Sequence, residues 1–172
     1  MLKKTPFFMV LIICFSACVT KKKPETVKTV DINKYAGKWY EIASFPTRFQ
    51  KGCTCSTAEY VINEKKGYIE VLNSCIRNNK LSSIKGKAYP IKGSNNTKLK
   101  VQFFWPFKGD YWIIELDDNY KWAAVGSPKL NYLWILSRTP QMDEITYNLI
   151  KEKLIKKGFD VYKLVKTNYN CK

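Results

Sequence analysis

A stretch of 104 residues, from Tyr35 to Arg138, is divided by closely spaced turn signals, and this spacing limits the possible folds more than any other feature. Glycine, asparagine, aspartate and proline favour tight turns because they accept left-handed or fixed backbone angles. Such residues gather at 65–67, 77–79, 92–96, 108–110, 117–119 and 126–128. Eight strands would each receive about 13 residues with their turns, which predicts an up-and-down antiparallel barrel.

Between the turn signals, apolar and polar residues alternate, as expected of strands whose two faces meet different surroundings. The alternation is clearest over 99–103 and 120–122, where the lysines and Gln102 are expected to face water. Extended through the other strands, it predicts an inward-facing set made of Ala58, Tyr60, Val71, Asn73, Ala88, Val101, Phe103, Tyr111, Trp122, Trp134 and Leu136. This mainly apolar lining with a few hydroxyl and amide groups suits an amphipathic lipid. A barrel of this size holds either packed side chains or one small ligand, and the small Ala58 and Ala88 favour a cavity.

A helix is expected after the strands. Thr139 can cap it, Pro140 suits its first turn, and Asp143 with Glu144 complements the positive end of its dipole. Its apolar stripe is formed by Met142, Ile145, Leu149, Ile150 and Leu154, which predicts packing against the outside of the barrel. The segment 159–165 is predicted to add a short strand.

The N-terminal segment is typical of an exported lipoprotein. Residues 1–17 combine two early lysines with an apolar stretch too short to span a bilayer, which predicts a signal peptide. Phe15-Ser16-Ala17-Cys18 resembles a bacterial lipobox, so Cys18 is expected to carry lipid, and Val19 after it favours sorting to the outer membrane. The alternative is an ordinary cleaved signal with a free Cys18. Residues 18–30 are predicted to form a flexible tether and residues 31–172 the barrel domain.

The chain contains no histidine, which removes Ser-His and Cys-His nucleophile pairs and imidazole metal ligands. Glu41, Glu59 and Glu115 are single carboxylates without a paired partner in the pattern. We therefore expect no catalytic residue, metal or cofactor. Loss of residues 1–17 lowers the formal net charge from +16 to +14. The lysines are spread through the turns and the C-terminal helix, so nucleic acid is not an expected partner, and attraction to anionic lipid is a secondary expectation.

Four cysteines remain for disulfides once Cys14 leaves with the signal peptide and Cys18 is lipidated: Cys53, Cys55, Cys75 and Cys171. An exported chain favours disulfides, and the three possible pairings are not distinguished by spacing. Redox catalysis by Cys53-Thr54-Cys55 is disfavoured because the spacing is not Cys-x-x-Cys.

The chain resembles the lipocalin family from about residue 31 to 162. Gly37-Lys38-Trp39 opens the first strand, Arg138 closes the last, and Asp117 with Tyr120 lies between them in the order found in that family. The resemblance implies a base where the Arg138 guanidinium packs on the Trp39 indole. Residues 86–88, 103–107 and 132–140 resemble the bacterial lipocalin and apolipoprotein D branch.

The resemblance implies an eight-stranded antiparallel lipocalin barrel with the C-terminal helix outside, and disulfides Cys55–Cys171 and Cys53–Cys75. It also implies a non-enzymatic role in the bacterial envelope. There the protein, anchored to the outer membrane and facing the periplasm, would store or transport a fatty acid or lysophospholipid. The alternatives are an envelope maintenance or interaction lipoprotein with a filled barrel and, less favoured, an enzyme acting on a lipophilic substrate. Monomer and homodimer both stay open.

Overall fold

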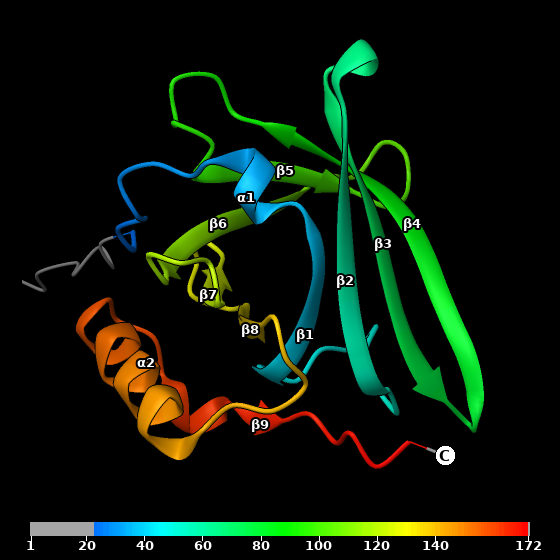
Figure 1. Cartoon of the computed structure of the whole chain (residues 1–172), viewed down its shortest axis with the longest axis vertical. Helices are drawn as coiled ribbons and strands as arrows, with labels where there is room; N and C mark the ends of the chain where they lie inside the picture. Colours follow the sequence, from blue (N-terminus) through cyan, green and yellow to red (C-terminus); the bar gives the residue numbers. More distant parts are fainter. Residues whose placement is uncertain (1–22, 172) are drawn as a thin grey trace, which may run out of the picture.

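The structure is a computed structural model that describes residues 23–171 (Figure 1). The predicted signal peptide and Cys18 lie outside the described residues. The elements in chain order are α1 (Ile32–Tyr35), β1 (Gly37–Ser44), β2 (Thr54–Asn63), η1 (Glu64–Lys66), β3 (Tyr68–Arg77), β4 (Lys80–Pro90), β5 (Lys98–Gln102), β6 (Gly109–Leu116), β7 (Trp122–Gly126), β8 (Leu133–Ser137), α2 (Glu144–Lys156), η2 (Val161–Lys163) and β9 (Val165–Lys166).

The first eight strands form a closed antiparallel barrel. Each strand pairs with the next, and β1 closes the ring by pairing with both β2 and β8. The short β9 adds to β1 outside the ring. The expected up-and-down barrel is therefore present.

Because all neighbours are antiparallel, the loops alternate between the two barrel ends. The β1–β2, β3–β4, β5–β6 and β7–β8 loops share one end, here called the mouth. The other loops and α1 share the opposite end, called the base.

Two apolar clusters lie on opposite sides of the barrel wall. The inner cluster includes Trp39, Val71 and Leu99. The outer cluster joins β6, β7 and β8 to α2, whose Tyr147, Ile150 and Leu154 are buried. As Figure 1 shows, α2 lies beside the barrel, as predicted from sequence.

The start of α2 differs from the prediction. Asp143, not Thr139, is the N-cap, and its Oδ1 accepts a hydrogen bond of 2.8 Å from the backbone N–H of Thr146. This bond lowers the pKa of the Asp143 carboxyl. The face of α2 that meets the barrel carries Tyr147, Ile150 and Leu154, and Ile145 and Leu149 of the predicted stripe lie on the other side of the helix and are exposed. None of the helices among residues 23–171 has the length and hydropathy to cross a bilayer.

Residues 23–30 correct the expectation of a flexible tether, because this part of the chain is bonded to the barrel. The backbone N–H of Val27 donates to Ile113 O at 3.1 Å, and that of Val30 donates to Asn95 O at 3.0 Å. Pro24 and Val30 are buried. Carbonyl groups of β6 and of the β4–β5 loop thus fix this segment.

Both expected disulfides are present. Cys53–Cys75 joins the end of the β1–β2 loop to β3, with Cα atoms 5.5 Å apart. Cys55–Cys171 joins β2 to the C-terminal segment, with Cα atoms 6.4 Å apart. In addition, the Tyr169 hydroxyl donates to Ser56 O at 2.6 Å, so the last residues lie against the outside of β2.

Candidate functional site

Arg138 closes the base of the barrel. Its guanidinium carbon lies 3.7 Å from the ring centroid of Trp39, which is fully buried. Its Nη1 donates to Lys38 O at 2.8 Å, and its Nη2 donates to Lys34 O at 2.7 Å and Ala36 O at 3.0 Å. Burial lowers the pKa of the Arg138 guanidinium. The charged fork thus satisfies carbonyl groups at the end of α1 that would otherwise lack donors.

The other motif residues of the base also have structural contacts. Gly37 has φ +91°, a left-handed conformation that glycine adopts readily, and it lies beside the Arg138 guanidinium. Asp117 Oδ2 accepts from the backbone N–H groups of Asn119 and Lys121 at 3.0 and 3.1 Å. The Tyr120 hydroxyl accepts from the backbone N–H of Asp31 at 2.8 Å. These contacts connect the residues of the base to one another.

Ten of the eleven predicted inward-facing residues point into the barrel. Nine belong to the inner apolar cluster: Ala58, Tyr60, Val71, Ala88, Val101, Phe103, Tyr111, Trp134 and Leu136. Asn73 lies two residues beyond Val71 on β3 and opposite Ala58 of β2, so it shares this face. Whether they contact a ligand stays a prediction.

Trp122 is the exception, because it belongs to the outer cluster under α2. The clear alternation of Tyr120-Lys121-Trp122 misled the prediction, since β7 begins only at Trp122 and Tyr120 lies in a turn with φ +58°. Alternation does not continue through such a turn. On β7 the inward residues are Ala123 and Val125.

The sequence reading missed several interior residues: Ile69, Leu99, Ile113, Ala123 and Val125. On β6 and β7 the reason is that both faces are buried, one by the interior and one by α2. Such strands read as continuous apolar runs, as in 112–114, and carry no alternation signal. Leu99 could have been found, since it lies two residues before Val101 in the clearest alternating strand.

Burial inside the barrel changes along its axis. Near the base, the interior side chains of Trp39, Leu99 and Ile113 are fully buried. Nearer the mouth, solvent still reaches part of the surface of the inward residues Asn73, Val101, Phe103, Tyr111 and Trp134. The exposure of the inward-facing side chains therefore increases from the base towards the mouth.

Three tyrosine hydroxyls meet in the interior. Tyr111 Oη lies 2.7 Å from Tyr35 Oη and 2.8 Å from Tyr60 Oη. Burial raises the pKa of Tyr60 to about 12 and raises the pKa values of Tyr35 and Tyr111 well above the ordinary value. The cluster is therefore neutral at physiological pH and can donate hydrogen bonds.

A second polar group faces the interior of the barrel. Asn73 Oδ1 is buried and has no hydrogen-bond partner among residues 23–171. An unpaired buried acceptor costs free energy, so a ligand hydroxyl or a water that donates to it would be stabilising.

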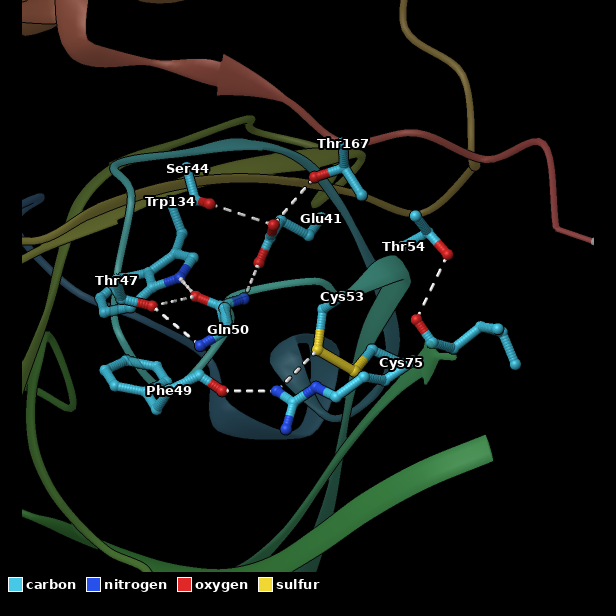
Figure 2. The surroundings of a disulfide bond; sticks show 12 residues. Glu41, Ser44, Thr47, Phe49, Gln50, Cys53, Thr54, Cys75, Trp134 and Thr167 are labelled. Atoms are coloured by element: carbon cyan, nitrogen blue, oxygen red, sulfur yellow. Dashed lines mark hydrogen bonds between the residues drawn. A yellow bond between two sulfur atoms is a disulfide. The ribbon is translucent and has the colours of Figure 1, made fainter. Parts of the chain in front are cut away.

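The β1–β2 loop folds over the mouth through Gln50 (Figure 2). The Gln50 Oε1 accepts from Trp134 Nε1 at 3.1 Å, and its Nε2 donates to Glu41 Oε2 at 2.6 Å. Glu41 is buried and also accepts from Thr167 Oγ1 at 2.8 Å. This network connects an interior tryptophan, the loop and the C-terminal segment, and the Glu41 carboxylate has a structural use.

Two hollows lie outside the barrel. One of about 370 Å³ covers the outer face of β1–β3 and is bordered by Tyr40, Leu72 and Tyr169. One of about 270 Å³ lies between α2, β1 and the C-terminal segment. Both are open to solvent and include none of the inward-facing residues. The barrel interior is the candidate site because the side chains that line it are mainly apolar.

A family model described as a lipocalin-like domain matches residues 30–169, which is most of the chain. The chain belongs to the lipocalin family. Members of this family bind small hydrophobic ligands.

Two relatives span nearly the whole lipocalin domain. Temperature-induced lipocalin-1 of Arabidopsis thaliana is 45% identical over 156 residues, covering 86% of this chain and 83% of its own. Outer membrane lipoprotein Blc of Vibrio cholerae is 41% identical over 148 residues, which cover 83% of this chain and 86% of its own. In structure, this lipocalin resembles insecticyanin from the tobacco hornworm Manduca sexta, with a TM-score of 0.71 and 21% sequence identity. The match covers 89% of this chain and 88% of insecticyanin. At that identity, the likeness to insecticyanin concerns the fold alone.

Proposed function

We propose that this lipocalin binds one fatty acid or lysophospholipid in the mouth half of its barrel and stores or carries it in the bacterial cell envelope. The observation that carries the proposal is that inward-facing apolar side chains remain accessible towards the mouth while the base is sealed by Trp39 and Arg138. Because the base is sealed, a chain-shaped ligand would enter lengthwise from the mouth. The proposed role is binding, without catalysis.

The apolar lining supports an acyl chain as the buried part. Val101, Phe103 and Trp134 lie around the accessible half of the interior. Each buried methylene contributes about 0.8 kcal/mol, so ten of them contribute about 8 kcal/mol before the costs of association. This is enough for micromolar binding or tighter only when those costs stay small.

The polar groups support an amphipathic ligand. The neutral hydroxyls of Tyr111 and its neighbours can donate to a carboxylate or ester oxygen, and the unpaired Asn73 Oδ1 can accept from a glycerol hydroxyl. A purely apolar ligand would use neither group.

The proposed location is the outer membrane, facing the periplasm, with lipid on Cys18. The lipobox-like sequence before Cys18 supports it, and so does the similarity to an outer membrane lipoprotein. Mass spectrometry of the protein from membranes, compared with Cys18→Ala, tests this part. A mature chain that starts at Cys18 and carries acyl chains is expected, and a chain without acyl mass on Cys18 would refute the anchor.

Native mass spectrometry tests the ligand. Protein lacking residues 1–22, which retains the whole described fold, is fused to a cleavable signal peptide and exported so that its disulfides form, and co-purifying molecules are extracted. A mass shift that matches a fatty acid or lysophospholipid is expected. If no adduct forms after incubation with both lipid classes, the barrel is filled, and the function lies on the surface of the protein.

A further inference from the structure

Four large aromatic side chains are exposed on loops of the mouth. Trp105 is 87% exposed, Phe107 77% and Phe104 68%, all on the β5–β6 loop, and Phe49 on the β1–β2 loop is 61% exposed. Contiguous exposed apolar surface of this kind marks an interaction site in a soluble domain.

These aromatic residues belong to one rim. The antiparallel order places the β1–β2, β5–β6 and β7–β8 loops at the same barrel end. The ring centroids of Phe49 and Tyr132, from the first and last of these loops, are 6.3 Å apart, and Tyr132 stacks on the interior Trp134 at 5.7 Å. The rim is thus continuous with the lining of the candidate site.

The rim is also strongly basic. The mouth loops, residues 45–53, 78–79, 103–108 and 127–132, contain no acidic residue. They carry four exposed basic side chains, Arg48, Lys51, Lys108 and Lys129, and Lys80 at the start of β4 adds a fifth. The lysines look scattered along the sequence, but the fold brings several of them next to exposed aromatic rings.

The base lacks both properties. Its loops and α1 region carry four acidic residues, Asp31, Glu64, Asp117 and Asp118, together with lysines. Ile91 is the large apolar side chain exposed on a base loop, and it is only 36% exposed. Positive charge without acidic residues and exposed aromatic rings therefore coincide at the mouth.

We propose that the mouth docks on a bilayer that contains anionic phospholipid. Trp105, Phe104 and Phe107 enter the boundary between headgroups and acyl chains, where aromatic side chains are favoured at membrane surfaces. The basic residues of the rim lie against lipid phosphates, to which lysine and arginine are attracted. Docking itself needs no bound ligand, so it stands apart from the proposed transport function.

The placement of the rings favours a bilayer over a nucleic acid. Proteins that bind single strands present aromatic rings along a groove, where successive bases stack on them. Here the rings lie at loop ends around Pro106, beyond the end of the barrel, which suits entry into an interface. Docking by the mouth also places the accessible interior directly against the source of lipids.

Vesicle binding tests the proposal on protein lacking residues 1–22. Sedimentation is compared for vesicles with about 30% phosphatidylglycerol in phosphatidylcholine and for pure phosphatidylcholine. Binding to the anionic vesicles is expected to be at least about tenfold tighter and to weaken at high salt. The emission of Trp105 is expected to shift to shorter wavelength on binding, and this shift should be absent in Trp105→Phe.

Matched variants separate the rim from general effects. Trp105→Ser with Phe107→Ser, and Arg48→Glu with Lys108→Glu, are each expected to weaken vesicle binding by about tenfold or more. The controls are Ile145→Ser with Leu149→Ser on α2, and Lys66→Glu with Lys156→Glu, which alter exposed residues away from the mouth. Near-ultraviolet circular dichroism verifies that all variants fold. Equal loss in rim and control variants, absence of vesicle binding, or equally tight binding to a single-stranded oligonucleotide would overturn the proposal.

Discussion

The guanidinium carbon of Arg138 lies 3.7 Å from the ring centroid of Trp39, and Nη2 of the same group donates to the backbone carbonyls of residues 34–36. Replacing Arg138 with alanine removes the cation–π contact and removes the Arg138 donor from the Lys34 and Ala36 carbonyls, while Tyr35 O keeps its bond from Trp39 Nε1. Arg138→Ala is expected to lower the free energy of unfolding by about 2–4 kcal/mol.

Urea unfolding followed by near-ultraviolet circular dichroism measures this loss. Arg138→Lys should recover only a small part, since an ammonium cannot present the planar fork. Arg48→Ala, which removes an exposed arginine, serves as the control and should change stability by less than about 0.5 kcal/mol. An equally small effect of Arg138→Ala would mean that the base is held by other contacts.

The base could be predicted from the resemblance to the lipocalin family, and the strand order could be predicted because turn and alternation signals are local. Leu99-Lys100-Val101 alternates because Leu99 and Val101 pack in the inner cluster while Lys100 lies on the other face of β5. The orientation of Trp122 and the start of α2 could not be predicted in this way, because both depend on what packs against them. The basic aromatic rim is also invisible along the chain, since its residues come from loops that only barrel closure brings to one end.

Gly86 provides space for an interior side chain. A Cβ at this position would lie 2.7 Å from Phe103 Cδ1 and 2.8 Å from Gln102 O, so Phe103 or the neighbouring strand must move. Gly86→Ala is expected to cost about 1–3 kcal/mol of stability. Gly109→Ala is the control, because its nearest neighbour, Val101 O, would be 3.9 Å away. Thermal unfolding of both variants measures this difference in stability. Equal melting temperatures would show that the Phe103 side chain moves aside without cost.

The tyrosine cluster predicts sensitivity to alkali. In the folded state the pKa of Tyr60 is raised to about 12, whereas the unfolded chain releases this proton near pH 10. The contribution of protonated Tyr60 to the free energy of unfolding is therefore complete below about pH 10 and is lost as the pH rises to about 12. Tyr60→Phe should flatten the fall in unfolding free energy over this range, measured by urea titration at several pH values. The exposed Tyr162 is the site for a control Tyr162→Phe, which should leave the slope unchanged.

Trp134 and Trp122 lie on neighbouring strands but on opposite sides of the barrel wall. A ligand in the interior would change the fluorescence of Trp134, which faces the accessible half, and leave Trp122 under α2 unaffected. Titration with a fatty acid should therefore give a fluorescence change in the native protein and in Trp122→Phe, and a much smaller one in Trp134→Phe. Because Trp134 Nε1 also donates to Gln50, calorimetric titration must show that Trp134→Phe still binds the ligand. If Trp122→Phe abolished the signal instead, the ligand would lie outside the barrel, near α2, and the interior would not be the binding site.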